Sequence, residues 1–227
     1  MRVSVITAAL NEELNVQAAI RSAIEAGADE VVVVDGGSSD ATADVAAQTG
    51  ANVIRTAAGR AKQQNAGVDA TSGDVLLFLH ADCTLGKDAI RQIRDRGASF
   101  FFGAFRQKID DPATVYRLVE RGNNWRIRWL GLPYGDQAIA VRRSLLEQAG
   151  KFADVPFLED YLLSQTLRRR HWPQLLPGPV YASSRRWRKQ GVVRQTLLNW
   201  RLLAAYHRGV PIAELATRYR RHDQPKP

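Results

Sequence analysis

The stretch EVVVVDGGSSD, from Glu30 to Asp40, constrains the fold of this chain more than any other. Its run of valines suits a β-strand, and an unbroken apolar run is typical of a strand buried on both faces of a sheet. Asp35 ends the run, so its carboxylate is expected at the carboxyl edge of the sheet, where open α/β sheets bind ligands. Gly36 and Gly37 allow unusual backbone angles and the close approach of a ligand. An ordinary βα loop that contains glycine is the alternative interpretation.

Short apolar strands alternate with helices through the first part of the chain. Strands are expected over residues 3–8, 30–35, 51–55 and 75–79, and helices over residues 12–25, 41–49 and 60–70. Asn11 is the predicted cap of the first helix, and Leu14 belongs to its predicted apolar side. This alternation with short loops predicts an α/β fold, with a mostly parallel sheet flanked by helices and right-handed crossovers.

The second part of the chain has a less regular pattern. Helices are expected over residues 87–96, 113–129 and 159–170, and strands over residues 99–106 and 138–141. The tail suggests two more helices, divided near Gly209, and it is rich in arginine and tryptophan. We therefore expect one sheet domain over residues 1–190, with a basic helical extension over residues 191–227 packed on it.

A strongly basic composition narrows the choice of partners. The formal charge is +9 and the sequence pI is about 10.1, which suits nucleotide phosphates, nucleic acid or an acidic membrane surface. Cys83 is the only cysteine, so no internal disulfide can form and a reducing compartment is indicated. The start does not resemble a signal peptide, and no stretch approaches the roughly 18 apolar residues of a membrane span. A cytoplasmic protein is expected, with a peripheral place at the inner face of the membrane as an alternative.

Several motifs in order carry a resemblance to a known family. They are TAALNEE, VVDGGSSD, GRAKQQNAG, LFLHAD, GDQAIAVRR and FLED, between about Val3 and Trp187. In this order the chain resembles the family 2 glycosyltransferases, which have a GT-A fold and use nucleotide-diphosphate sugars. The GRAKQQNAG, LHAD and SSRRW stretches are most similar to the small bacterial branch known as arsenosugar-biosynthesis-type glycosyltransferases.

The resemblance implies a set of residues that contact the nucleotide sugar. They are Ala8, Ala9, Leu10, Glu12, Asp35, Gly37, Arg60, Lys62 and Asn65. In the family the acid that matches Asp35 hydrogen-bonds the base, usually uracil, and a carboxylate can accept from a ring N–H. Arg60 and Lys62 also stand out by themselves, because they occupy the first turn of a predicted helix, where the dipole disfavours cations. A bound anion would compensate, and solvated surface charges are the alternative.

The predicted fourth strand ends in His80-Ala81-Asp82, where the family usually carries Asp-x-Asp. The resemblance implies that Asp82 binds Mg²⁺ or Mn²⁺, which bridges the diphosphate, and that His80 and Ala81 lie beside the nucleotide. Oxygen ligands suit these ions. The imidazole of His80 replaces the first acid and can hydrogen-bond a ribose hydroxyl or a phosphate, with a structural histidine as the alternative. Cys83 is expected to be a small buried apolar residue.

The family also implies where the reaction takes place. An inverting transfer needs one general base, and the family's Glu-Asp pair at a helix start matches Glu159 and Asp160, with Asp160 as the base. An acidic helix start that merely suits the dipole is the alternative. Asp136 matches the segment that lines the donor sugar and acceptor. Arg186 matches the arginine of an Arg-Trp motif that faces the diphosphate, with a basic surface loop as the alternative.

The favoured hypothesis is therefore an inverting, metal-dependent glycosyltransferase that moves a sugar from a nucleotide sugar, expected to be a UDP-sugar, to an acceptor hydroxyl on a small molecule or a lipid. The second hypothesis is a basic protein that binds an anionic membrane or nucleic acid. Nucleic acid is disfavoured because no recognition motif is present. The third is a nucleotidyltransferase, against which TAALNEE counts, because it lacks the basic glycine-rich loop that binds a triphosphate. A homodimer is left open.

Overall fold

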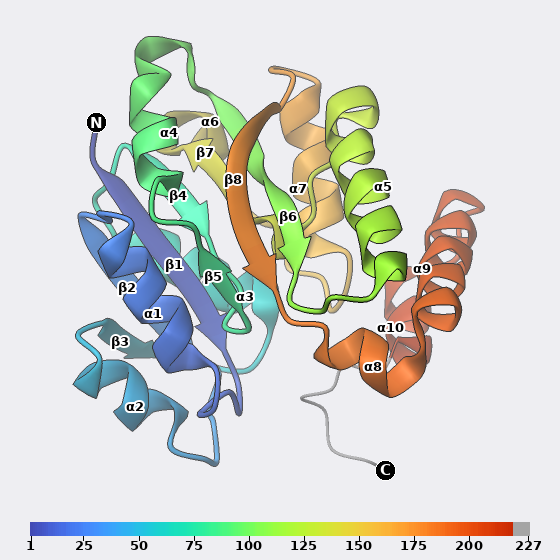
Figure 1. Cartoon of the computed structure of the whole chain (residues 1–227), viewed down its shortest axis with the longest axis horizontal. Helices are drawn as coiled ribbons and strands as arrows, with labels where there is room; N and C mark the ends of the chain where they lie inside the picture. The colour runs from blue at the N-terminus through green and yellow to red at the C-terminus, as the bar shows by residue number, and fades with distance from the viewer. Residues whose placement is uncertain (220–227) are drawn as a thin grey trace.

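The computed structural model describes residues 1–219 of the chain, which form one sheet covered by helices on both faces (Figure 1). The sheet order is β3-β2-β1-β4-β7-β6-β8-β5. The strands are β1 (Val3–Ala9), β2 (Glu30–Asp35), β3 (Asn52–Arg55), β4 (Val75–Phe78), β5 (Cys83–Leu85), β6 (Phe102–Ile109), β7 (Ile139–Arg142) and β8 (Gln174–Ala182). β3, β2, β1 and β4 pair in parallel, β7 is antiparallel to both neighbours, and β6 and β8 are parallel to each other. The predicted mostly parallel α/β sheet is confirmed.

Ten α-helices in the described part of the chain surround this sheet. They are α1 (Val16–Glu25), α2 (Thr42–Gln48), α3 (Arg60–Asp69), α4 (Ala89–Asp95), α5 (Thr114–Leu130), α6 (Arg143–Gln148), α7 (Glu159–Arg168), α8 (Arg185–Gln190), α9 (Val192–His207) and α10 (Ile212–Arg218). Two 3-10 turns, Gly97–Ser99 and Gly135–Gln137, complete the described elements. No helix of residues 1–219 combines the length and the apolar character that a membrane span requires.

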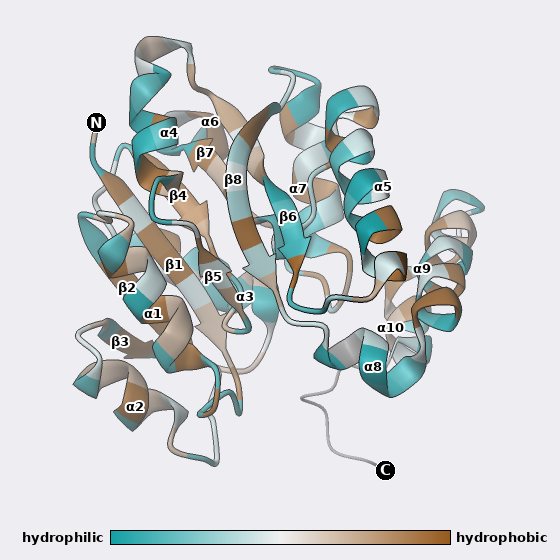
Figure 2. Cartoon of the chain, in the orientation of Figure 1, coloured by the Kyte–Doolittle hydropathy of each residue, from teal (hydrophilic) through white to brown (hydrophobic). Residues whose placement is uncertain are grey.

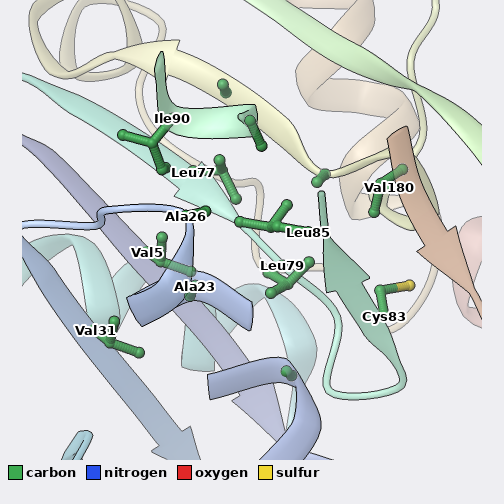
Figure 3. Close-up of a cluster of buried hydrophobic side chains, with 14 of the residues drawn as sticks. Val5, Ala23, Ala26, Val31, Leu77, Leu79, Cys83, Leu85, Ile90 and Val180 are labelled. Atoms are coloured by element: carbon green, nitrogen blue, oxygen red, sulfur yellow. The ribbon is translucent and has the colours of Figure 1, made fainter. Parts of the chain in front are cut away.

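Alternate residues of each central strand enter different cores, because successive side chains of a strand point to opposite faces of the sheet. On one face Val5 and Leu77 pack with α1, α2 and α4; Figure 3 shows these two residues beside Ala23 and Ile90. On the other face Ile6 and its neighbours pack with α3, α6 and α7. Figure 2 shows the resulting hydrophobic colour along β1 and β4. Strands with two covered faces explain the nearly continuous apolar runs of the sequence.

The first helix differs from its prediction over residues 12–25. It begins only at Val16, and Asn11 is not its cap. Asn11 adopts a left-handed backbone conformation with a φ of 53°, its N–H donates to Ser38 Oγ at 3.0 Å, and its Oδ1 accepts from the Ser39 N–H at 2.9 Å. These bonds tie the loop after β1 to the loop after β2. Leu14, predicted to be on the buried side, is 88% exposed because it lies in this loop.

Two strands and two α-helices, β5, β8, α6 and α8, were not predicted. β5 and β8 pair with each other at one edge of the sheet. In the segment SSRRWR, for which a basic surface loop was the alternative interpretation, the residues RRWR belong to the short helix α8. The tail does form two helices, α9 and α10. They pack on the loop before α7 through a small core that contains Phe157, Leu202 and Leu215. The division between residues 190 and 191 stays a prediction.

Gly67 sets how closely α3 can approach the sheet. A Cβ at this position would overlap the side chain of Ile6 and lie 3.2 Å from Val34 Cγ2. We expect Gly67→Ala to lower the free energy of unfolding by about 1–3 kcal/mol, because an overpacked core must shift its backbone. Urea denaturation measures this effect. Gly122→Ala, in an open position of α5, is the matched control and should gain up to about 1 kcal/mol from helix propensity. Equal effects of the two substitutions would contradict this account.

Candidate active site

Asp35 lies at the carboxyl end of β2, in register with Ala9 of β1. Its side chain is almost fully buried and accepts hydrogen bonds from the N–H and the hydroxyl of Ser38. Arg55 Nε lies 3.8 Å from Asp35 Oδ2. The position of Gly37 is open, since a Cβ there would meet nothing within 4 Å. A carboxylate held in place beside open space is a good acceptor for the ring N–H of a base.

The loop after β1 reaches across to α8. Glu12 is only 7% exposed, and its carboxylate accepts from Asn15 Nδ2 and from Arg185 Nη2, the latter at 2.9 Å. The same guanidinium lies 3.8 Å from Asp82 Oδ2. Ala8 and Leu10, at the end of β1 and in the loop that follows it, are half-buried. Arg185 therefore connects the loop expected to hold the nucleotide with the acid expected to hold the metal. It was missed in the sequence because the adjacent Arg186 matched the motif.

His80, Asp82 and Cys83 lie together just after β4. One ligand atom of each falls within 4.8 Å of the others, so the group has the compactness of a metal site. Burial raises the pKa of the Cys83 thiol well above its ordinary value, and the charge of Asp82 raises it further. A thiol is a poor ligand for Mg²⁺ or Mn²⁺, whereas the Asp82 carboxylate is a suitable one and the His80 imidazole is an acceptable one for Mn²⁺. Cys83 is a buried apolar residue, as expected.

Asp82 and His80 determine whether a divalent ion fits this site. Asp82 is partly exposed and supplies oxygen atoms at the sheet edge. Mg²⁺ in particular is commonly held by one or two carboxylates, with water and substrate phosphates as its other ligands. Such an ion needs an open site with few protein ligands, which is what Asp82 and His80 provide. The residues present therefore fit Mg²⁺ or Mn²⁺.

Arg60 links this group to the start of α7. Its Nη1 lies 3.4 Å from His80 Nε2, and its Nε lies 3.7 Å from Glu159 Oε1. Burial alone would lower the pKa of Arg60, but the carboxylates of Glu159 and Asp160 outweigh it and raise the pKa above its ordinary value. Arg60 is therefore a permanent cation between the two acidic parts of the site.

Asp160 is held by backbone groups. Its Oδ2 accepts from the Gly135 N–H at 2.8 Å, and its Oδ1 accepts from the Tyr161 N–H at 2.7 Å. A Cβ at Gly135 would overlap the His80 ring, so only glycine lets this turn pass between His80 and Asp160. The carboxylate thus has one fixed orientation beside His80.

Asp136, the neighbour of Gly135, is a buried acid. Its Oδ2 accepts from Gln107 Nε2 at 2.8 Å, and its buried Oδ1 has no hydrogen-bond partner in residues 1–219. Burial raises the pKa of Asp136, although the positive charge of Arg126 opposes the shift. A buried acid with a raised pKa is typical of functional sites. Such acids also occur in hydrogen-bond networks that are purely structural.

Arg126 supports the turn that carries Gly135 and Asp136. Its guanidinium donates to the Leu132 carbonyl at 2.9 Å and to Gln137 Oε1 at 2.8 Å, and it lies 3.5 Å from the centre of the Tyr134 ring. Burial lowers the pKa of Arg126 and raises the pKa of Tyr134 to about 12. No sequence signal separates Arg126 from the other arginines of α5, because its partners are Asn123 of the same helix, a backbone carbonyl and a residue of the turn that follows α5.

Some predicted site residues have other contacts in the structure. Both amide atoms of Asn65 bond to the backbone of Phe152, at 2.9 Å and 3.0 Å. Lys62 is half-exposed and lies 3.7 Å from Asp154, and Ala81 is buried in the core. Arg186 belongs to α8, but its side chain lies outside the part of the chain that the structure describes. The roles of these residues in ligand binding stay predictions.

Taken together, the fold and the site define an α/β protein whose acidic groups line the carboxyl edge of a mainly parallel sheet, the usual ligand position in such folds. The family model described as "Glycosyl transferase family 2" matches residues 4–150, which is more than half of the chain. The chain belongs to this family. A search of curated proteins gives no significant match.

Solved structures with the same architecture support the fold. The S. aureus TarS 1-349 structure is 20% identical with a TM-score of 0.63, and the match covers 81% of this chain and 61% of that one. Its complex with UDP-GlcNAc is 19% identical, with a TM-score of 0.62 and coverages of 81% and 58%. Glucosyl-3-phosphoglycerate synthase from Mycobacterium tuberculosis, in complex with Mn²⁺, UDP and glucosyl-3-phosphoglycerate, is 23% identical, with a TM-score of 0.54 and coverages of 80% and 70%. This chain thus spans about three fifths of the length of the TarS structures, and it has the GT-A fold of these glycosyltransferases.

Proposed function

We propose that this protein is an inverting, metal-dependent glycosyltransferase that uses a nucleotide sugar, with UDP as the nucleotide. The single observation that carries the proposal is the arrangement of Asp35, Asp82 and Asp160 along one edge of the sheet, with Arg60 between the last two. The structures of TarS with UDP-GlcNAc and of the mycobacterial synthase with UDP and Mn²⁺ support this choice of donor.

The donor would lie along this edge, with its base beside Asp35 and its diphosphate toward Asp82. The open position of Gly37 leaves room for the base. Arg60 is a permanent cation, and a guanidinium matches the oxygen atoms of a phosphate in charge and in geometry. Its position in the first turn of α3, which is unfavourable for the helix dipole, is then compensated by the bound anion.

Asp82 and His80 would hold a Mg²⁺ or Mn²⁺ ion. When bound, such an ion neutralises charge on the leaving diphosphate. Arg185 lies 3.8 Å from Asp82 and adds a second positive group on the same side. These residues would stabilise the nucleoside diphosphate as it departs.

Asp160 would act as the general base. The acceptor oxygen attacks the anomeric carbon while the bond from that carbon to the diphosphate oxygen breaks on the opposite face, and the hydroxyl proton passes to Asp160. The two backbone N–H groups that hold Asp160 keep its carboxylate in one orientation, which reduces the cost of positioning in the transition state. Glu159 pairs with Arg60 and would help to place that cation.

The experiment that tests the function is a panel of nucleotide sugars incubated with the protein and Mn²⁺. We expect hydrolysis or thermal stabilisation with at least one UDP-sugar and loss of the effect on addition of a chelator. UTP with sugar 1-phosphates serves as the control for nucleotidyl transfer. Activity with that pair, and none with any UDP-sugar, would sink the proposal.

Several finer properties of the protein are also proposals. They are membership of the arsenosugar-biosynthesis-type branch, a cytoplasmic location, the domain limits at residues 190 and 191, and a homodimer. The acceptor is proposed only as a hydroxyl compound. A transfer assay with each candidate acceptor, using the donor that the panel identifies, decides this point.

A further inference from the structure

The outer face of α9 carries exposed apolar side chains. No other helix or strand in the described part of the chain covers them. Val193 is 68% exposed, Leu197 is 43% exposed and Trp200 is 67% exposed. These positions are four and then three residues apart, so they form one stripe on the helix. A contiguous exposed apolar patch with a tryptophan in it commonly marks a binding surface.

The surroundings of this stripe are strongly basic. No aspartate or glutamate occurs between residues 185 and 213. Arg194, Arg201 and Arg208 are exposed and seven residues apart, so they form a second stripe beside the first. Figure 2 shows hydrophilic residues along the adjoining α8, whose Arg188 is 63% exposed and pairs with Asp111 at 2.7 Å. α9 is thus amphipathic in an unusual way, with an exposed apolar stripe beside an exposed basic one.

Another helix of the second part, α5, repeats this pattern. α5 exposes Leu118, Trp125 and Trp129, at 62%, 55% and 60%, together with Arg121 and Arg128. The only acid of α5 is Glu120, which is buried and accepts from the Ile109 N–H.

α8 connects the two helices. Trp187 of α8 packs against Tyr116 of α5 with ring centres 6.1 Å apart, and α9 follows α8 directly in the chain. We name the exposed residues of the two helices the tryptophan-arginine surface; they are Leu118, Arg121, Trp125, Arg128, Trp129, Val193, Arg194, Leu197, Trp200, Arg201 and Arg208.

We propose that the tryptophan-arginine surface binds the surface of an anionic lipid bilayer. Tryptophan and leucine side chains can enter the boundary between headgroups and acyl chains, and arginines can pair with anionic headgroups at the same depth. Each basic residue near such a surface adds about fivefold in affinity. The apolar stripe and the basic stripe of α9 lie side by side. One face of the helix can therefore insert apolar side chains and pair with anionic headgroups.

The charge pattern argues against the other occupants. A symmetric dimer through this surface would bring its arginines against identical arginines with no acid between residues 185 and 213 to pair with them. Nucleic acid would match the arginines, but phosphate contacts leave the exposed leucine and valine side chains without a role. An anionic bilayer accounts for both kinds of residue.

The end of α9 lies close to the helix that carries the proposed base. Tyr161, which follows Asp160 directly, has its hydroxyl 2.8 Å from His207 Nε2 at the end of α9. The ring of Phe157 stacks on Tyr219 at 4.2 Å, beyond the end of α10. A bilayer against α9 would therefore lie next to the helix that carries Asp160. The proposal itself does not depend on the transferase reaction.

Vesicle flotation tests the proposal without any sugar donor. We expect the full chain to float with vesicles that contain phosphatidylglycerol and to remain at the bottom with pure phosphatidylcholine. The double variant Arg194→Gln, Arg201→Gln should bind roughly 30-fold more weakly. The pairs Leu197→Ser, Trp200→Ser and Trp125→Ser, Trp129→Ser should each lose at least about tenfold.

The matched control variants change residues of two other helices, α1 and α4. Ile24→Ser and Arg91→Gln change exposed residues of α1 and α4, and they should bind vesicles as the wild type does. Thermal melting checks that each variant is folded. The proposal is overturned if the wild type does not bind the anionic vesicles or binds both kinds equally, or if either apolar pair binds like the wild type. Tighter retention by duplex DNA, or a dimer that the α9 pair disrupts, would also overturn it.

Discussion

Asp160→Asn is expected to reduce sugar transfer by a factor of about 100 to 10,000 and to leave UDP binding unchanged. An amide cannot accept the acceptor's proton, and a general base contributes a factor of this size. Asparagine keeps the shape of the side chain and an oxygen that can still accept from the Gly135 N–H, so the turn should stay in place. Initial rates with the donor identified in the panel, and calorimetric titration of UDP, measure the two quantities.

Two comparisons make this result specific. Asp95→Asn changes an exposed acid on α4 and should transfer at the wild-type rate. Glu159→Gln weakens the pair with Arg60, so it should raise the KM for the donor more than it lowers kcat. If Asp160→Asn keeps full transfer, Asp160 is not the base, and the buried acid Asp136 becomes the next candidate.

Asp82→Ala is expected to abolish the increase in UDP affinity that Mn²⁺ produces in the wild type. Loss of the principal oxygen ligand should cost about 3 kcal/mol, or roughly a hundredfold in affinity for UDP in the presence of the ion. Without the ion, the variant should bind UDP at least as well as the wild type does, because a negative charge facing the diphosphate has been removed. Calorimetric titrations of UDP with and without Mn²⁺ measure this difference.

His80→Ala separates the two possible roles of the histidine. A ligand of the ion would make this variant lose part of the Mn²⁺ effect, whereas a purely structural histidine would lower the melting temperature and leave the Mn²⁺ effect intact. If Asp82→Ala keeps the full Mn²⁺ effect, the metal is held elsewhere, and the proposed position of the diphosphate is wrong.

The alternating part of the fold could be predicted from the sequence, and the edge of the sheet could not. β1, β2 and β4 are apolar because both of their faces are covered, so their pattern is visible in the residues alone. β5 has only three residues, and the middle of β8 contains Pro177, Gly178 and Pro179, so neither carries a clear strand signal. Their pairing depends on tertiary contacts.

The motifs predicted where the candidate site residues lie in the fold, and the roles of these residues stay predictions. Asp35 ends β2, Asp82 follows β4 and Asp160 belongs to the first turn of α7, as their motifs predicted. The supporting contacts were not predictable, because Asp160 is held by the backbone of Gly135 and Tyr161. The start of α1 was predicted too early for a similar reason, since the side chain of Asn11 bonds to a loop that is distant in the sequence.

The most direct test of the central claim is a crystal structure of the protein with UDP and Mn²⁺. We predict that the uracil lies against Asp35, that the ion is coordinated by Asp82, and that the diphosphate lies between Asp82 and Arg60. The hydroxyl acceptor should then have access to the anomeric position from the side of Asp160. A nucleotide bound away from the carboxyl edge of the sheet, or an ion held without Asp82, would contradict the account.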